Sequence, residues 1–502
     1  MTPNGNSPNA EQAVESPTYL ADIRFYFRPQ DIEHMAAKGI DLGTYDGVKD
    51  NAISIDAHTS PPDADMPPDE EARWSAARVQ TFEKWIADGF PLGTAKPVEP
   101  PPPPQAPARL RKEVTTLSDA EFELLAKAFN ALMARDPDDP NGYFVLAGHH
   151  WLPKRFCLHH EDRFNPWHRQ YLLEFEDALR SVPGCEDVTI PYWDFSTPLP
   201  ERLQHPPFDK YVLPADPGAA AVPPKTGFFP YTTQRYPVAE ITQNMADSGV
   251  LADTATSLNQ SLWGAYNKGG YQKFSIQAHD SGHLSIGPTM ADQNVASYDP
   301  VFWFFHCNLD RLWLSWQTHV GATTLTTFLS TLAPTQNKKW LTQSPFNALK
   351  PFSVTADQTI ESKVSYDRLE PVAPPEDVLE NLFGSIAATS RFAFRSASPV
   401  SVRVKGIDRL NIPGSFVVSL LADGEPIAKR GFFQPDDPRL CATCVEHGIV
   451  NLDFRMTQDQ LVDKTLSVRI DVPSHAEEIG TAFPLSQAGD PTVNARLLVE
   501  EA

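Results

Sequence analysis

The chain has 502 residues, of which 41% are hydrophobic and 21% charged, as is usual for globular proteins. A chain of this length is too long to fold around one ordinary hydrophobic core, so we expect several domains. The formal net charge of −22 excludes long-range attraction to nucleic acid or to an anionic membrane, because both depend on concentrated Lys and Arg. We therefore expect neither a nucleic-acid partner nor a membrane partner.

The N-terminal residues 1–17 are polar and rich in Pro and Asn, which predicts a disordered tail. They contain no basic stretch followed by an apolar one, so a cytoplasmic location is expected unless a partner exports the chain. The five cysteines are an odd number and too few for a disulfide scaffold. Reduced thiols with local roles are therefore expected.

Residues 18–95 predict a small N-terminal α+β domain to which no chemistry can be assigned. Ile23–Phe27 is typical of a strand, and apolar residues recur at helical spacing from Trp74 to Ile86. A Pro-rich linker over residues 96–108 follows. Its five consecutive prolines, Pro100–Pro104, must adopt extended polyproline geometry and form a stiff spacer.

Residues 109–335 predict a mainly α-helical domain with the architecture of a four-helix bundle. Apolar stripes at helical spacing run through Asp119–Ala134, Trp167–Val182 and Phe304–Trp316. After a connector over residues 336–378, residues 379–502 predict a β-sandwich, because short segments with period-two alternation recur. These segments are Phe392–Phe394, Val400–Val404, Phe416–Leu420, Val450–Phe454, Leu466–Ile470 and Arg496–Val499.

Two clusters of histidines lie within the predicted helical domain. The first contains the pairs His149-His150 and His159-His160 and then His168, and the second contains His279, His283 and His306. Because His279 and His283 are four residues apart, their rings would project from one face of a helix toward one ion. Facing helices of a bundle can hold a core metal in this way, and imidazole suits copper as well as zinc, iron or nickel. The sequence thus predicts two three-histidine metal sites.

Both clusters resemble the copper motifs of the type 3 dicopper family, which comprises tyrosinases, catechol oxidases and haemocyanins. Cys157-Leu158-His159, with His168 nine residues further on inside Phe164–Leu172, is similar to the first motif. Asp299–Trp313 is similar to the second motif along its whole length, and Pro191–Asp194 resembles a segment that lies between them in the family. The likeness covers about residues 140–320 and points to bacterial tyrosinases and polyphenol oxidases.

The resemblance implies two copper ions as cofactors. Their ligands would be His150, His159 and His168 for copper A, and His279, His283 and His306 for copper B. His150 is preferred to His149 because similar bacterial tyrosinases have a Gly-x-His pattern there, and His160 is expected beside the ligands or at the surface. The resemblance to fungal-type tyrosinases also implies a thioether between Cys157 and His159, with a buried free thiol as the alternative. Asp310 and Arg169 are expected to form a buried pair that ties two ligand helices together.

The activity implied by the resemblance is oxidation of phenols with O2 as co-substrate. It would comprise o-hydroxylation of monophenols, oxidation of o-diphenols to o-quinones, or both, through a side-on peroxo dicopper centre. Phe302, Trp303 and Trp167 are expected to line an apolar cavity for a small phenolic or catecholic substrate. The alternatives are a catechol oxidase or o-aminophenol oxidase without monophenolase activity, a haemocyanin-like O2-binding protein, and a zinc-binding structural bundle.

The residues around His279 leave monophenolase activity open. Many relatives have a Glu a few residues before this ligand and an Asn directly after it, and these hold a water that accepts the phenolic proton. Here Gln277 and Asp280 stand in this region, so Gln277 could hold the water, and Asp280 could act as the base or orient His279.

The predicted β-sandwich contains Cys441 and Cys444 in a CxxC motif. Soft thiolates select copper(I), so the pair is a candidate copper-loading site, with a disulfide or an incomplete zinc site as alternatives. In the family this domain often covers the active site and inserts an aromatic plug. Phe432 or Phe433 is the candidate plug, and the alternative is that both belong to the sandwich core. The sequence leaves a homo-oligomer open.

Overall fold

The structure is a computed structural model that describes residues 13–36, 38, 40–60, 64–67, 73–93, 109–264, 269–332, 336–370, 399–475 and 482–497. Among these residues, no helix is both long enough and apolar enough to cross a membrane. Several predictions lie wholly or partly outside the described residues. They are residues 1–12 of the predicted tail, the linker 96–108 with its spacer Pro100–Pro104, the later part of the connector (371–378), the strand Phe392–Phe394, and residues 498–499 of the strand Arg496–Val499.

The N-terminal unit is helical, and the predicted strand Ile23–Phe27 is wrong. Residues Ile23–Tyr26 form a 3-10 turn, in which Ile23 and Phe27 are buried while Phe25 points outward. Burial at positions i and i+4 is the pattern of a helical turn, which a run of five residues cannot distinguish from a strand. The helices of this unit are α1 (Pro29–Ala36), α2 (Tyr45–Asp50), α3 (Ala52–Thr59) and α4 (Ala76–Ala87).

The central unit is built from helices that match the predicted apolar stripes. Its four longest helices are α5 (Asp119–Met133), α7 (Phe164–Arg180), α10 (Tyr271–Ile286) and α12 (Val301–His319). Shorter helices complete it: α6 (Tyr143–Gly148), α8 (Val238–Asp247), α9 (Val250–Leu258), α11 (Pro288–Ala291), α13 (Leu325–Leu329) and α14 (Lys339–Thr342). The parallel pair β1 (Arg109–Arg111) and β2 (Val364–Tyr366) joins the two ends of this unit.

The C-terminal segment forms two three-stranded antiparallel sheets. One has the order β6-β3-β8 and the other β5-β4-β7. The strands are β3 (Pro399–Asp408), β4 (Phe416–Ala422), β5 (Glu425–Phe432), β6 (Ile449–Thr457), β7 (Leu466–Asp471) and β8 (Thr492–Leu497). Inward side chains of both sheets share one apolar core, and the short helices α16 (Ala442–Glu446) and α17 (Gln458–Leu461) lie in the connections.

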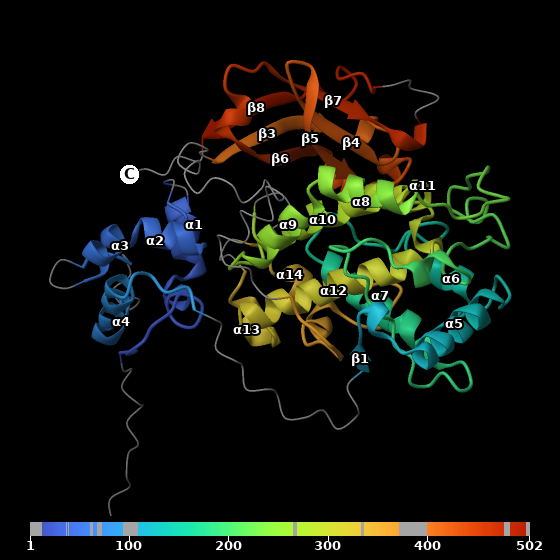
Figure 1. The fold of residues 1–502 in the computed structure, drawn as a ribbon, viewed down its shortest axis with the longest axis horizontal. Coiled ribbons are helices and arrows are strands. Elements are labelled where there is room, and N and C mark those ends of the chain that lie inside the picture. Colours follow the sequence, from blue (N-terminus) through green and yellow to red (C-terminus); the bar gives the residue numbers. More distant parts are fainter. Residues whose placement is uncertain are drawn as a thin grey trace, which may run out of the picture.

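These sheets lie directly over the central helices, with α8, α10 and α11 beneath them and α1–α4 to one side (Figure 1). Strand β5 packs directly against α10. A Cβ on Gly431 would lie 2.9 Å from the Cα of Ser281, so only glycine fits there, and the Gly431 N–H donates to Ser281 Oγ at 3.1 Å. The sheets are thus held against the helix that carries His279 and His283.

Candidate metal centre

Six histidine side chains converge in the interior of the central unit. His168 lies on α7, His279 and His283 lie one turn apart on α10, and His306 lies on α12. His150 follows the short helix α6, and His159 comes from the segment before α7. All six are buried, with at most 5% of any residue exposed.

The rings form two groups that face each other. In the first group, the ring centroid of His150 lies 5.0 Å from that of His159 and 5.9 Å from that of His168. In the second group, His279 lies 4.4 Å from His283 and 5.2 Å from His306. The two groups meet where His168 stacks on His306 at 4.5 Å and where His159 lies 5.3 Å from His279. The predicted sets of three are therefore adjacent in one cluster.

Hydrogen bonds fix the orientation of three of these rings. The Nδ1 atoms of His168 and His283 lie 2.8 Å from the carbonyl oxygens of Phe164 and Met290. The Nδ1 of His279 lies 2.8 Å from Oδ1 of Asp280. Because each of these acceptors requires a proton on Nδ1, the lone pair of each ring is left on Nε2, as in metal sites whose ligands donate their other N–H.

The cluster fits a pair of soft-to-borderline metal ions such as copper. Burial lowers the pKa of His150 to about 3 and holds those of His159, His168, His283 and His306 well below the ordinary value, so the imidazoles are neutral. Both nitrogens of His150 and the Nε2 of His279 are buried without a hydrogen-bond partner among the described residues. Neutral imidazole nitrogens of this kind are the donors that copper prefers.

Cys157 lies against the first group of rings. Its Sγ is 3.4 Å from both ring nitrogens of His159, which flank Cε1, and also 3.4 Å from Nε2 of His168. The residue is a buried free thiol in the structure, and burial raises its pKa well above the ordinary value. The predicted thioether to His159 has the required proximity and stays a prediction.

Of the two neighbouring pairs, His150 and His159 belong to the cluster while His149 and His160 do not. The His149 ring packs against Phe156 and Phe352. His160 is buried and faces the C-terminal sheets, where it stacks on Phe432 at 4.5 Å. It also contacts the carboxylate of Asp280, with its Nε2 2.8 Å from Oδ2.

The two candidate residues next to His279 face different surroundings. Asp280 uses Oδ1 on His279 and Oδ2 on His160. Burial acts to raise its pKa, but its interactions with the two histidines outweigh burial and hold the pKa below the ordinary value. Gln277 precedes His279 by two residues and so points to roughly the opposite side of α10. There it lines, with Asp280, a cavity of about 20 Å³ under β5 and β6, enough for one water. This position does not favour a role for Gln277 beside the metals.

The two candidate plug residues, Phe432 and Phe433, lie in different surroundings. The Phe433 ring stacks on the His283 ring at 4.1 Å and lies 5.3 Å from His159, so it covers the histidine cluster from the side of the sheets. Phe432 is part of the core between the sheets, where it stacks on Phe416. Of the two, only Phe433 stands where a plug would stand.

The three aromatic residues expected to line a cavity behave differently. Phe302 contacts His306 at 4.1 Å and His150 at 4.9 Å, and Trp167 contacts His168 at 4.9 Å. Trp303 turns away from the cluster and stacks on Phe175 at 3.5 Å. The expectation for Trp303 is wrong, because adjacent helical residues point about 100° apart, and Trp303 is directed toward Phe175 of α7 while its neighbour Phe302 contacts the histidines.

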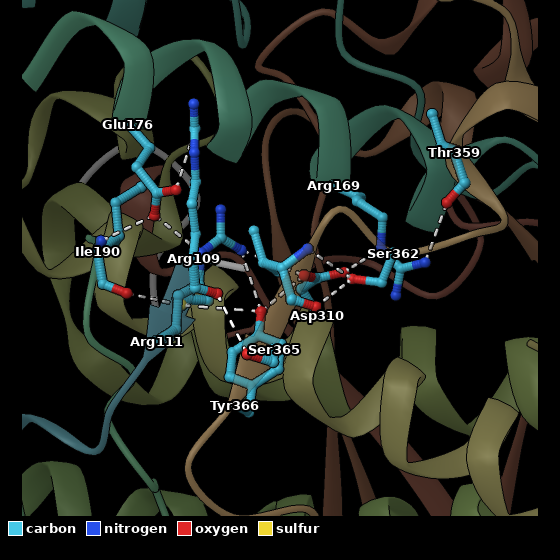
Figure 2. Close-up of polar contacts among 12 residues, drawn as sticks. Arg109, Arg111, Arg169, Glu176, Ile190, Asp310, Thr359, Ser362, Ser365 and Tyr366 are labelled. Atoms are coloured by element: carbon cyan, nitrogen blue, oxygen red, sulfur yellow. Dashed lines mark hydrogen bonds and ion pairs between the residues drawn. The ribbon is translucent and has the colours of Figure 1, made fainter. Parts of the chain in front are cut away.

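The helices that carry His168 and His306 are joined by a buried ion network, as predicted for Arg169 and Asp310. The Nε of Arg169 donates to Oδ1 of Asp310 at 2.6 Å, and Arg111 and Tyr366 donate to Oδ2 at 3.2 and 2.6 Å. Figure 2 shows Arg111 and Arg169 converging on Asp310, with Glu176 as a second partner of Arg111 at 2.9 Å. Nothing in the sequence near Arg111 indicates this role, because only the β1–β2 pairing brings it there.

Cys441 and Cys444 form a disulfide, so the expectation of reduced thiols is wrong for this pair. Their Cα atoms are 5.1 Å apart, within the range that a disulfide spans. The pair packs against Trp151 and Leu152, which directly follow His150. In this form it offers no thiolate, so copper loading would require its reduction.

Sequence reasoning missed one residue at the cluster's edge, Arg409 of the C-terminal segment. Its Nη1 lies 3.2 Å from Nδ1 of His160, and its guanidinium lies over the ring of Phe432 at 4.6 Å. The side chain is fully buried. No pattern around Arg409 marks it, since its partner lies 249 residues earlier in the chain.

Comparison with protein families gives a match to one model, described as the common central domain of tyrosinase. It matches residues 140–226 and 225–319, which include all six clustered histidines. Haemocyanin 2 of Megathura crenulata is 30% identical over 241 residues, which is 41% of this chain and 6% of that protein. A tyrosinase of Streptomyces lincolnensis is 30% identical over 177 residues, 32% of this chain and 64% of that protein. The chain thus spans less than two thirds of these relatives.

Among solved structures, the tyrosinase of Burkholderia thailandensis has a similar fold. The TM-score is 0.55, the sequence identity is 20%, and the match covers 78% of this chain and 100% of that chain. At this identity the likeness concerns the fold alone. It extends well beyond the 180-residue span of the central domain.

Proposed function

Through residues 140–319 the chain belongs to the type 3 dicopper family, and on this premise we propose that it is a copper-dependent phenol oxidase. The observation that carries the proposal is the convergence of six buried, neutral imidazoles in two adjacent sets of three. Three nitrogen donors for each ion leave coordination positions open for a ligand, unlike the closed four-ligand site of structural zinc. We propose small phenols or catechols as substrates and O2 as co-substrate.

Bound at this cluster, a pair of copper ions would supply the two-electron redox chemistry. The chain's own residues hold and shield that pair. Asp280 and the carbonyl oxygens of Phe164 and Met290 keep the Nε2 atoms of three ligands available. Phe302 and Trp167 pack against the ligand rings and exclude water, which strengthens electrostatic interactions inside the site.

We further propose that the C-terminal sheets shield the site through Phe433. The Phe433 ring stacks on His283 within 19° of parallel, which is the way a flat aromatic substrate would stack on that imidazole. A phenol cannot occupy the same face of His283 while Phe433 is there. Activity therefore requires that Phe433 moves or is removed.

The surroundings of His279 support o-diphenol oxidation in preference to monophenol hydroxylation. Both oxygens of Asp280 are engaged by histidines, and Gln277 faces the sheets. Neither residue presents a free base toward the cluster. A catechol gives up its protons more readily than a monophenol, so it depends less on such a base.

Oxygen uptake by copper-reconstituted protein tests the proposal, with tyrosine and with a catechol as substrates. We expect slow catechol oxidation by the full chain and a several-fold faster rate for Phe433→Ala. Phe454→Ala is the matched control, since it removes a buried aromatic ring from between the sheets and leaves Phe433 in place. An equal rate gain in both variants would indicate a general destabilisation of the C-terminal sheets and would contradict the proposal that Phe433 blocks the site.

An O2-binding protein on the same metal pair is the second candidate, favoured by the covered cluster and by the haemocyanin relative. It predicts two bound copper ions and reversible O2 binding with no catechol turnover, even in Phe433→Ala. Turnover by that variant at many equivalents of catechol per chain would exclude a pure carrier.

A further inference from the structure

We propose that Arg409 and His160 are positioning residues for His279, so that the C-terminal sheets set the geometry of the copper B site as well as covering it. The inference rests on the proposed copper centre. It assigns to the C-terminal segment a role in holding metal, distinct from the shielding role of Phe433.

A continuous chain of contacts links the sheets to the ligand. Nη1 of Arg409 lies 3.2 Å from Nδ1 of His160, and Nε2 of His160 lies 2.8 Å from Oδ2 of Asp280. Oδ1 of Asp280 lies 2.8 Å from Nδ1 of His279. Each of the four residues is buried, at most 3% exposed, so water does not compete for these contacts.

The chemistry of these groups fixes the direction of every hydrogen bond. A guanidinium has only donors, so Nδ1 of His160 must accept from Arg409, and the His160 proton lies on Nε2. That N–H donates to Oδ2 of Asp280, while Oδ1 accepts from Nδ1–H of His279. The lone pair of His279 is therefore on Nε2, the atom left for the metal. The carboxylate of Asp280 thus fixes the tautomers of both histidines, and Arg409 holds His160 with its Nε2–H directed at Oδ2.

Arg409 is itself held rigidly by the C-terminal segment. Its Nε donates to Oε1 of Gln434 at 3.0 Å, and Nη2 contacts Sγ of Cys444 at 3.1 Å. Gln434 in turn donates to the carbonyl oxygens of Ile412 and Gly414 at 2.8 and 2.9 Å. The guanidinium therefore has little freedom to leave His160.

His160 is also held in an uncommon backbone conformation. Its φ is 56°, in the left-handed region that few residues other than glycine adopt. Strained backbone of this kind persists where the surroundings require it, and it concentrates at functional sites. Here the surroundings are the Phe432 ring, stacked at 4.5 Å, and the two polar partners of the imidazole.

The other oriented ligands do not depend on the sheets. Nδ1 of His168 and Nδ1 of His283 use carbonyl oxygens of the central unit. Loss of Arg409 should therefore weaken copper B and leave the three ligands of copper A as they are. Substitution of an outer-shell partner typically lowers metal affinity 10–100-fold.

The test is a copper titration against a chelator, with copper retained per chain as the readout. Arg409→Met removes the donor, and His160→Phe keeps the ring stacked on Phe432 but removes both hydrogen bonds. We expect each variant to bind the first copper with wild-type affinity and the second about 10–100-fold more weakly than wild type. His160→Gln should restore most of the affinity, because its amide oxygen can accept from Arg409 and its amide nitrogen can donate to Asp280.

Arg430→Met is the matched control. Arg430 is also buried, also projects from the sheets, donates to Ser248 O at 2.6 Å and Asp253 Oδ1 at 3.2 Å, and contacts no clustered histidine. We expect it to retain both copper ions, and thermal unfolding of the metal-free variants separates loss of fold from loss of metal.

Three outcomes overturn the inference alone. The first is wild-type affinity for both copper ions in Arg409→Met and His160→Phe, and the second is an equal loss in Arg430→Met. The third is a His160→Gln variant that binds the second copper no more tightly than His160→Phe does. Two retained copper ions without catechol oxidation, both in wild type and in Phe433→Ala, would overturn the proposed function and leave this inference standing. Fewer than two copper ions in wild type would overturn both.

Discussion

Two buried arginine–carboxylate networks support the histidine cluster, and they differ in where their members come from. In the first, Asp310 binds Arg169, Arg111 and Tyr366, all within the central unit (Figure 2). In the second, Asp280 is linked through His160 to Arg409 in the C-terminal segment. The first network therefore belongs to one unit, and the second spans two.

The two networks also act on different properties of the ligands. The first joins α7 to α12 and so fixes the distance between the helices that carry His168 and His306. The second fixes the tautomer and the ring orientation of His279 alone. Breaking the first should destabilise the metal-free protein, whereas breaking the second should mainly weaken metal binding. The predictions below separate these two effects, from the largest to the smallest.

Asp310→Ala should give the largest loss of stability. It leaves the buried guanidinium of Arg169 without its carboxylate and removes one of two carboxylates from Arg111. Breaking a buried ion pair from one side costs about 3–5 kcal/mol of unfolding free energy. Urea unfolding of the metal-free protein measures it. Asp471→Ala, which breaks the more exposed pair with Arg469, should cost at most about 1 kcal/mol, and equal losses would contradict the comparison.

Asp280→Ala should act on metal binding more than on folding. It removes the acceptor of His279 Nδ1, and we expect about 10–100-fold weaker binding of the second copper. Asp280→Asn should be intermediate, because its amide oxygen can still accept from His279 while its amide nitrogen meets the N–H of His160. Chelator competition measures both variants. A larger effect on unfolding than on copper affinity would assign this carboxylate to the same role as Asp310.

The double substitution of Cys441 and Cys444 by Ser should have a smaller effect on stability. The bridge closes a loop between residues three apart, so the chain-entropy model gives about 2 kcal/mol at most. Urea unfolding under non-reducing conditions measures it. If the reduced thiols pass copper to the centre before the bridge closes, the same variant will load less copper per chain at limiting copper. Unchanged copper loading would mean that the pair has only a structural role, beside Arg409.

Asp292 should make the contact between the two units pH-dependent. Burial, and next the charge of Asp436, raise its pKa from 3.8 to about 7. Because the folded protein binds this proton more tightly than the unfolded chain, stability is lost as the pH rises from about 4 to about 7. Asp292→Asn should therefore match wild type near pH 4 and be more stable than wild type near pH 8. Thermal unfolding at the two pH values measures it, and a destabilised variant at pH 8 would contradict the sign.

Local sequence patterns predicted the parts of this protein that depend on neighbours along the chain. The apolar stripe from Phe304 to Trp316 predicted the core of α12, and the four-residue spacing of His279 and His283 predicted one helix face. The alternation in Val400–Val404 predicted part of β3. Strand β5 escaped prediction because its residues, which include Pro426 and the adjacent Lys429 and Arg430, do not alternate between apolar and polar.

Only the tertiary structure decided the contacts between residues that are far apart in the chain. The sequence determined that six histidines occur in two clusters, on segments that form helices or precede them. It did not determine that Phe433 stacks on His283, that Trp303 turns away, or that Arg409 reaches His160 across 249 residues. Helical and strand periods are local properties of the backbone, whereas these contacts follow from how whole sheets and helices pack, which no single segment encodes.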